Sequence, residues 1–550
     1  MKKLKPASPA GRDHDGALRA VPASHPRTLA MSLRATLAGV LAFCGLAGMA
    51  AAQTPGGTLN LIASPEPPNM ILASNSMVAS QYMGSKVFQG LLTYGEDLKP
   101  RAELAKSWTI SPDGLTYVFQ LQEGVKWHDG QPFTAADVEF SIGKMLPAVH
   151  ARTRSTLNKH MESVKATGTH TVEIKLKKPF PPFISAFEVG TMPMMPKHLY
   201  DGKDYATNPA NQKPTGTGPF VFKEWKRGAY VKLERNPNYW KKGLPYLDGV
   251  VFHVMPDAAS RAVALEKGVV QVVRGGDLEV SDIKRLQKTP GVNYTVKGWN
   301  LFSPTLHLQL NMRKPPFDNV KVRQAIQHAL DRRFIVETVF EGQNRPATGV
   351  FSSTEMFYTT QNVPQYPFDL ARAKALIKES GVDVGKTPVR FTSMGLGGNY
   401  ERLIEYTKQM MEQIGFRVDI AAGDGGTWAS KVSNWDFDMT MNLPYQYGDP
   451  ALGVERLYVS HNIVKGSPFA NNQGYSNAKA DELWARGAVE LDPEQRRRIY
   501  EELQVILAQD VANNWLMDIE FPTLSAVSVK NVVSSSHSLT ESLDTVYIQK

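Results

Sequence analysis

Hydrophobic residues recur along the chain with two periods, and each period predicts a different element. Alternation of apolar and polar positions is the pattern of a strand with one buried face. It occurs in three runs: TYVFQLQ (116–122), TVEIKL (171–176) and TLHLQLNM (305–312). In the third run, Leu306, Leu308 and Leu310 fall on one face of the expected strand. Short strands are therefore expected both early and late in the chain.

Apolar residues spaced three and four apart, with start and stop signals, predict amphipathic helices. These helices are expected over 134–145, 318–340, 369–381 and 492–511, and in the first part of 399–420, where Gly415 and the strand FRVDI follow. Thr134 and Asp137 have the spacing of a capping box. Asp318 and Asp369 are placed to cap two later helices, and Gly381 is placed to end one. Helix and strand alternate after about residue 300, which favours an α/β fold.

The first 52 residues have the pattern of a secretory signal. Seven basic and two acidic residues precede an uncharged apolar run over 35–52, which ends in small residues. We expect cleavage after Ala52, and we interpret Met31 as the true translation start. A transmembrane anchor is the alternative, but the richness in Ala and Gly and the cleavage pattern favour a cleaved signal. An exported protein is therefore expected.

Removal of this signal changes the charge and the thiol content of the protein. The full chain of 550 residues has a net charge of +9 and one cysteine, Cys44. The part after Ala52 has 55 basic and 51 acidic residues, a net charge of +4, and no cysteine. Disulfides and Cys-ligated metals are thereby excluded from it, and no electrostatic feature indicates nucleic acid as a partner. The length suggests two or three domains.

No arrangement of residues indicates catalysis. The pattern S-x-x-K occurs three times without a K-T-G partner, and both G-x-S-x-G and a phosphate-binding Gly-rich loop are missing. The twelve histidines are scattered, with no metal-ligand spacing. His128 and Asp129 in WHDG fit a turn bounded by Gly130 better than a catalytic dyad. We therefore expect a binding protein that is not an enzyme and has no cofactor.

Several runs, in order along the chain, resemble one family. They include ELAKSWTISPDGLTYVFQLQEGVKWHDGQPFTAADVEFSI (103–142), GTGPFVFKEW (216–225), ERNPNYW (234–240) and VRQAIQHALDRRFIVETVFEG (322–342). Together they resemble periplasmic solute-binding proteins of the dipeptide, oligopeptide and nickel class, which deliver ligands to ATP-driven importers. The resemblance implies an α/β, two-lobed periplasmic binding protein fold, with an extra subdomain inserted in the first lobe and a ligand cleft between the lobes.

The resemblance also implies where the lobes begin and end. Lobe I would consist of 55–96, 211–300 and 516–550, its inserted subdomain of 97–210, and lobe II of 301–515. The chain would then cross between the lobes near 299–305 and 515–522, and these crossings would form the hinge. A ligand that bridges the lobes would stabilise the closed form.

The site residues that the resemblance implies depart from the peptide-binding pattern. Relatives carry an acid in a W-x-x-D-x-x-[DE]-P stretch that pairs with the peptide amino group. In LPYQYGDP (443–450) this position falls on Gln446, or on Tyr447 if the alignment shifts by one, and the Trp of the pattern is missing. Gln supplies no charge, so one charge-assisted bond is lost. Trp428 matches a pocket tryptophan of the family; a purely structural, buried tryptophan is the alternative. The other expected ligand-binding residues are Tyr445, Tyr447, Asp449, Ser74, Asn75 and Trp299.

The expected ligand is a small peptide or a peptide-like solute, with an opine-like compound or a short oligosaccharide as alternatives. A nickel role is not supported, because the stretch 428–450 contains no histidine. The expected partners are the membrane permease and ATPase of an importer, with no nucleic acid and a monomeric receptor. A sensory or chaperone-like binder, or an enzyme on the same scaffold, remains the alternative function.

Overall fold

The computed structural model describes residues 55–75, 77–150 and 152–549. The chain divides into two units, Met1–Ala52 and Gln53–Lys550, and the description below concerns the second unit by itself. The predicted signal, with Met31, Cys44 and Ala52, lies outside the described residues.

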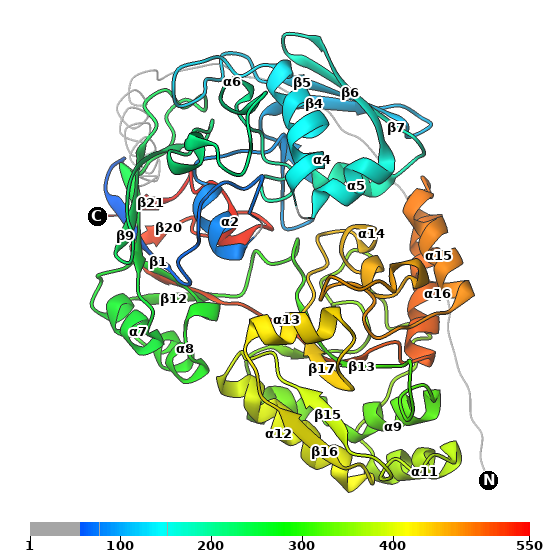
Figure 1. Cartoon of the computed structure of the whole chain (residues 1–550). Coiled ribbons are helices and arrows are strands. Elements are labelled where there is room, and N and C mark those ends of the chain that lie inside the picture. Colours follow the sequence, from blue (N-terminus) through cyan, green and yellow to red (C-terminus); the bar gives the residue numbers. More distant parts are fainter. Residues whose placement is uncertain (1–54, 76, 151, 550) are drawn as a thin grey trace, which may run out of the picture. The chain divides into compact units, whose positions relative to one another are not determined.

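A mixed seven-stranded sheet organises the first part of this unit. Its strand order is β12-β19-β11-β1-β10-β9-β8, and β1 runs parallel to both of its neighbours while the other pairs are antiparallel. The strands are β1 (Thr58–Ala63), β8 (Phe220–Lys226), β9 (Tyr230–Arg235), β10 (Gly249–Val254), β11 (Val272–Arg274), β12 (Val292–Thr295) and β19 (Thr523–Ala526). The helices beside it are α2 (Val78–Gly84), α7 (Ala258–Glu266) and α8 (Val280–Gln287) (Figure 1).

A four-stranded antiparallel sheet, drawn in blue and cyan in Figure 1, comes from a single stretch of chain. Its elements are β4 (Ala105–Ile110), β5 (Thr116–Leu121), β6 (Met161–Gly168) and β7 (Thr171–Leu176), with α3 (Ala135–Phe140), α4 (Leu146–Val149) and α5 (Thr153–His160). The predicted capping box is confirmed, because Asp137 Oδ2 accepts a 2.9 Å hydrogen bond from the Thr134 backbone N–H at the start of α3. One hydrophobic core continues from the seven-stranded sheet into this one.

A six-stranded sheet with its own core organises the rest. Its order is β14-β18-β13-β17-β15-β16. The strands are β13 (Thr305–Leu310), β14 (Arg345–Pro346), β15 (Val389–Thr392), β16 (Val418–Ala421), β17 (Met439–Asn442) and β18 (Asn514–Asp518). Its helices are α9 (Val320–Ala329), α11 (Leu370–Ser380), α12 (Gly398–Gln413) and α13 (Gly425–Ser433), and a further core forms around α14 (Pro450–Gly453), α15 (Ala478–Val489) and α16 (Pro493–Gln509).

The chain crosses twice between the seven-stranded and six-stranded sheets. It leaves one sheet after β12 and enters the other at β13, and it returns between β18 and β19. These crossings fall in the stretches expected from the sequence, and the predicted α/β two-lobed class is confirmed. The boundaries of the lobes and of the inserted subdomain remain a prediction. None of the described helices is both long and apolar enough to cross a membrane.

Most predicted elements are present, and one helix differs. The region 318–340 is broken, because α9 ends at Ala329 and a new turn starts at Arg332. Asn319, and not Asp318, caps α9, with its Oδ1 accepting from the Lys321 N–H at 2.9 Å. Asp331 caps the second turn, so a side chain that can cap a helix interrupts an otherwise continuous apolar period.

Candidate ligand-binding cleft

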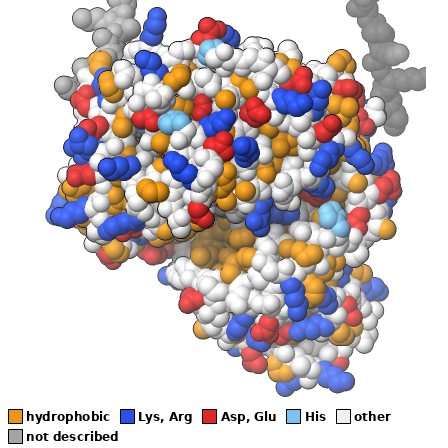
Figure 2. Space-filling model, turned by 45° about the horizontal axis from the view of Figure 1, so that its top comes forward, with side chains coloured by type: hydrophobic (Ala, Val, Ile, Leu, Met, Phe, Trp, Pro, Cys, Tyr) orange, Lys and Arg blue, Asp and Glu red, His pale blue; other side chains and the backbone are white. Residues whose placement is uncertain are grey.

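A cavity of about 710 Å³ lies between segments that are far apart in the sequence. One wall comes from the start of α2 and from α5, and the other from residues 443–470 and the first chain crossing. Its volume lies in the range of small-molecule binding sites. The space-filling view in Figure 2 shows a hollow in the surface of the unit, with hydrophobic side chains inside it. The cavity is the best candidate for a binding site in the described part of the chain.

Aromatic rings form the wall beside the first chain crossing. Phe302 packs between Trp299, Tyr445 and Tyr447, with ring centroids 5.6, 5.9 and 6.2 Å apart. Burial raises the pKa of the Tyr445 hydroxyl, so this side chain is neutral at physiological pH. These rings give the cavity flat apolar faces with polar edges, which suits a ligand that has both characters.

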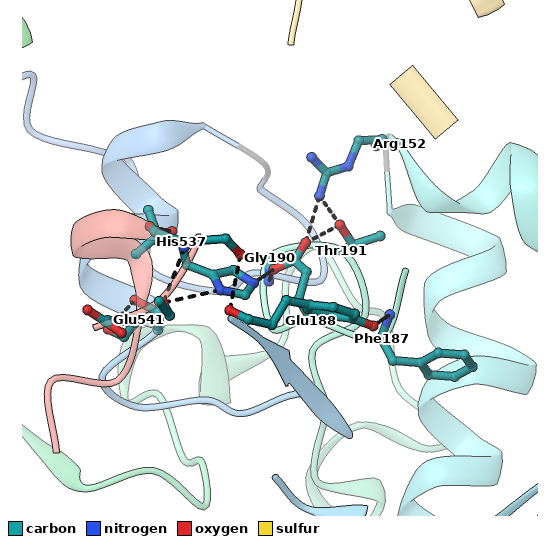
Figure 3. A network of polar contacts seen from close by, with 12 residues as sticks. Arg152, Phe187, Glu188, Gly190, Thr191, His537 and Glu541 are labelled. Carbon is teal, nitrogen blue, oxygen red and sulfur yellow. Dashed lines mark hydrogen bonds and ion pairs between the residues drawn. The ribbon is translucent and has the colours of Figure 1, made fainter. Parts of the chain in front are cut away.

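Arg152 projects toward this aromatic wall from the segment before α5. Its guanidinium carbon lies 4.0 Å from the Tyr447 ring centroid, within cation–π distance. On the other side, Nη2 donates to Glu188 Oε1 at 3.3 Å and to the Thr191 hydroxyl (Figure 3). The Glu188 side chain is only 4% exposed. Arg152 is therefore fixed from behind by a buried carboxylate while its face meets the opposite wall.

Arg456 belongs to the same wall as Tyr447, opposite the wall that carries Arg152, and it lies near the same tyrosine ring. Its guanidinium carbon lies 5.8 Å from the Tyr447 ring and 5.8 Å from the Phe469 ring. No carboxylate in the described part of the chain lies within ion-pair distance of it. Its Nε is buried without a hydrogen-bond partner. Burial lowers the pKa of Arg456; the Tyr447 hydroxyl, which is hydrogen-bonded to Arg456, opposes this shift, and the nearby Arg152 adds to it.

Glu455 and Lys159 are the other residues with charged side chains on the cavity wall. The Glu455 carboxylate has no hydrogen bond or ion pair among the described residues. Burial raises its pKa to about 7; Lys159 opposes this shift, and Asp449 and Asp481 add to it. Among the described residues of the wall, three Lys or Arg side chains thus face one carboxyl group that is only partly ionised near neutral pH. No described group of three or more His, Cys, Asp or Glu residues is placed to hold a metal.

The residues predicted from the sequence differ in where they lie relative to the cavity. Tyr445, Tyr447 and Trp299 line the cavity. Ser74 and Asn75 lie just before the wall: the Asn75 carboxamide oxygen accepts from the N–H of Met77, which does line the cavity. The assignment of ligand contacts to all of these residues remains a prediction.

Gln446 and Asp449 are buried behind the wall and do not line the cavity. The Gln446 amide nitrogen donates to Glu355 Oε2 at 2.7 Å, and its oxygen accepts from the Ser352 N–H at 2.8 Å. Asp449 caps α14 and holds the Arg496 guanidinium through two bonds of 2.7 and 2.8 Å. Their polar groups are therefore satisfied within the fold.

Trp428 lies in helix α13, and its side chain is 5% exposed. Its indole N–H donates to the Thr440 hydroxyl at 2.9 Å, and its ring packs 6.0 Å from that of Phe469. Because Phe469 lines the cavity and Trp428 does not, the tryptophan supports the wall from behind.

Sequence reasoning missed the charged residues Arg152, Lys159, Glu455 and Arg456. Only one signal for them was available: Glu455 and Arg456 stand together inside the otherwise apolar run ALGVERLYV. Nothing in the sequence indicates that Arg152, from the segment before α5, would meet the same tyrosine.

Comparisons with known proteins agree with this architecture. Residues 99–465 match the model of a family described as bacterial extracellular solute-binding proteins, family 5 Middle. A curated relative, the glutathione-binding protein GsiB of Shigella flexneri serotype 5b (strain 8401), is 29% identical over 443 residues, which are 78% of this chain and 83% of that protein.

Solved structures give the same result. The ABC transporter substrate-binding protein CtaP of Listeria monocytogenes superposes with a TM-score of 0.79 at 26% identity, covering 90% of this chain and 100% of that one. The oligopeptide-binding protein AppA of Bacillus subtilis, in complex with a nonapeptide, gives 0.76 at 25% identity, with coverages of 90% and 100%. The binding protein AgaA with agropinic acid, from A. tumefaciens R10, gives 0.75 at 25% identity, with coverages of 90% and 99%.

Proposed function

The chain belongs to the bacterial extracellular solute-binding proteins of family 5, and we propose that it binds a small peptide or peptide-like organic solute in the cleft between its two lobes. In this proposal the protein is the receptor of an ATP-driven importer and hands the solute to the membrane permease. The family and the compared relatives are binding proteins. We propose that this chain likewise binds without converting its ligand.

One observation carries the proposal: a cavity of about 710 Å³ has walls on both sides of the two chain crossings. A solute held there contacts both halves of the molecule at once. Its binding energy then favours the form in which the halves are close together, by the difference in its affinity for the two forms. A permease that recognises this closed form would receive loaded receptor only.

The nature of the solute is inferred from the wall and from the relatives. Aromatic rings with polar edges, together with a few charged groups, suit the mixed surface of a short peptide. Among the relatives, GsiB is named for glutathione, AppA was solved with a nonapeptide and AgaA with agropinic acid. A short peptide is therefore our first proposal, and an opine-like compound is the second.

The site of action follows from the predicted signal. We propose that residues 1–52 direct export and are removed, so that the receptor acts in the periplasm beside its permease and ATPase. The described chain has no cysteine, so a thiol-containing peptide would be held without forming a mixed disulfide.

Native mass spectrometry of the protein, expressed as the full chain and purified without denaturation, tests the proposal. We expect an added mass of peptide size in wild type and its loss in a Tyr447→Ala variant. Tyr246→Ala is the matched control, because Tyr246 packs against Tyr547 outside the cavity. A preparation that neither carries a solute nor binds any member of a peptide and opine panel would contradict the proposal.

A further inference from the structure

The charged residues of the cleft point to a more specific ligand. Resting on the proposed function, we infer that the cleft selects acidic solutes and takes a solute carboxylate between the guanidinium groups of Arg152 and Arg456. Tyr447 lies beside both groups, at 4.0 and 5.8 Å from their guanidinium carbons.

The two arginines come from opposite walls. Arg152 belongs to the segment before α5, and Arg456 follows α14, beyond the first chain crossing. An anion that pairs with both side chains therefore links the two halves of the molecule. A planar carboxylate suits this position, because guanidinium groups bind carboxylates through parallel hydrogen bonds.

Arg456 gives the stronger evidence for a carboxylate ligand, because its charge has no acidic partner in the described structure. It lies against the Tyr447 and Phe469 rings, and its Nε is buried without an acceptor. A charge withdrawn from water without an opposite charge is unfavourable. A ligand carboxylate supplies both the missing acceptor and the missing charge, so the empty cleft is prepared for an anion.

Arg152 is prepared in a different way. Among the described residues its hydrogen bonds use Nη2, which Glu188 and Thr191 hold, while its Nε is buried without a partner. Glu188 is itself fixed by the Gly190 N–H, and the His537 ring lies beside it (Figure 3). The side chain is thus ordered before the ligand arrives, which reduces the entropy lost on binding.

The remaining charges of the wall favour the same class of ligand. Lys159 adds a third cation, and Glu455 is the only Asp or Glu among the described residues that line the wall. A cavity of one prevailing sign raises the local concentration of the opposite ion. A peptide of equal size with neither a side-chain carboxylate nor a free C-terminal carboxylate would leave Arg456 without an acidic partner in the complex.

The test is calorimetric titration with four tripeptides of equal size: Ala-Glu-Ala, Ala-Gln-Ala and the C-terminal amides of both. We expect affinity to fall as carboxylates are lost, with Ala-Gln-Ala amide at least tenfold weaker than Ala-Glu-Ala. Arg456→Gln should reduce this discrimination to less than threefold, and Arg456→Lys should retain part of it. Arg333→Gln, at a side chain 80% exposed and outside the cavity, is the matched control.

Two results would overturn the inference while leaving the proposed function intact: equal affinities for all four peptides, or full discrimination in a folded Arg456→Gln variant. Failure of every peptide to bind would contradict the peptide receptor. In that case the solute identified by native mass spectrometry tests whether the two arginines bind a carboxylate. A solute with a carboxylate supports the arginine pair, and a solute without one overturns it.

Discussion

The buried amide of Gln446 forms hydrogen bonds with one acceptor and one donor. Its nitrogen donates to Glu355, and its oxygen accepts from the Ser352 N–H. Burial, with the neighbouring Asp449, raises the pKa of Glu355 to about 8, while Arg496 acts against this shift. A neutral side chain that both donates and accepts is therefore the one this position requires.

Gln446→Asp should lower the stability of the protein. The change removes the donor to Glu355 and places another carboxyl group beside Glu355 and Asp449 in a buried region. The expected loss is about 2–4 kcal/mol, typical of an unpaired buried charge. Urea unfolding at pH 7 measures it, with Gln446→Asn as the neutral control. An Asp variant of wild-type stability that binds a different ligand would show instead that the position reads the ligand.

Affinity for an acidic peptide should fall as the pH rises from 6 to 8. Glu455, with its pKa raised to about 7, loses its proton in this window and adds a negative charge to the wall. Lys159, Asp449 and Asp481 are the charged groups around it. The expected change is about 0.5–1 kcal/mol, or roughly two- to fivefold. Calorimetry at both pH values should find this slope in wild type and a flat response in Glu455→Gln.

Three wall residues, Trp299, Tyr445 and Tyr447, were predicted as ligand contacts, and the structure places all three at the cavity. The charged residues could not be predicted, because Arg152 and Arg456 are far apart in the sequence and come near each other only in the fold, at the Tyr447 ring. Gln446 shows the opposite case: its position in the motif indicated a ligand contact, whereas local packing directs its amide to Glu355.

Helix α11 shows how much of an element local chemistry can determine. Asp369 Oδ1 accepts from the Arg372 N–H at 2.8 Å at its start, and Gly381, with φ of 68°, ends it in the left-handed region. Both were predicted from the sequence, as was Asp492 at the start of α16. The break after α9 was not predicted, because the apolar spacing continues through Leu330 while Asp331 starts a new turn.

Asp369→Ala should destabilise the protein by about 1 kcal/mol, because the first turn of α11 loses its side-chain acceptor. Chemical denaturation followed by circular dichroism measures the loss. Glu405→Ala, at an exposed position inside α12, is the control and should change stability by less than about 0.5 kcal/mol. Equal effects of the two changes would argue against a capping role.

The whole molecule is organised by two chain crossings between sheets that have separate cores. The binding cavity lies beside the first crossing, where Trp299 and Phe302 line it. A small rotation at the crossings would therefore change the width of the cleft, as in other hinged binding proteins. The sequence predicted this plan only through the ordered set of family motifs, because no local pattern specifies which strands share a sheet.

A bound solute should raise the melting temperature. At a ligand concentration of 100 times Kd the native form gains about 2.7 kcal/mol, which corresponds to roughly 2–4 °C for a chain of this size. Differential scanning calorimetry with Ala-Glu-Ala should show this rise in wild type and in Arg333→Gln, and a smaller one in Arg456→Gln. A rise of equal size in all three proteins would show that Arg456 does not contribute to binding of the peptide.

The most direct measurement is a crystal structure of the complex with the co-purified or best-binding solute. We expect ligand density in the cavity beside Tyr447, in contact with residues from both sides of the chain crossings. We also expect a ligand carboxylate within hydrogen-bond distance of Arg152 and Arg456. Density that contacts only one half of the molecule, or a ligand bound outside this cavity, would show that the solute is not held between the two lobes as proposed.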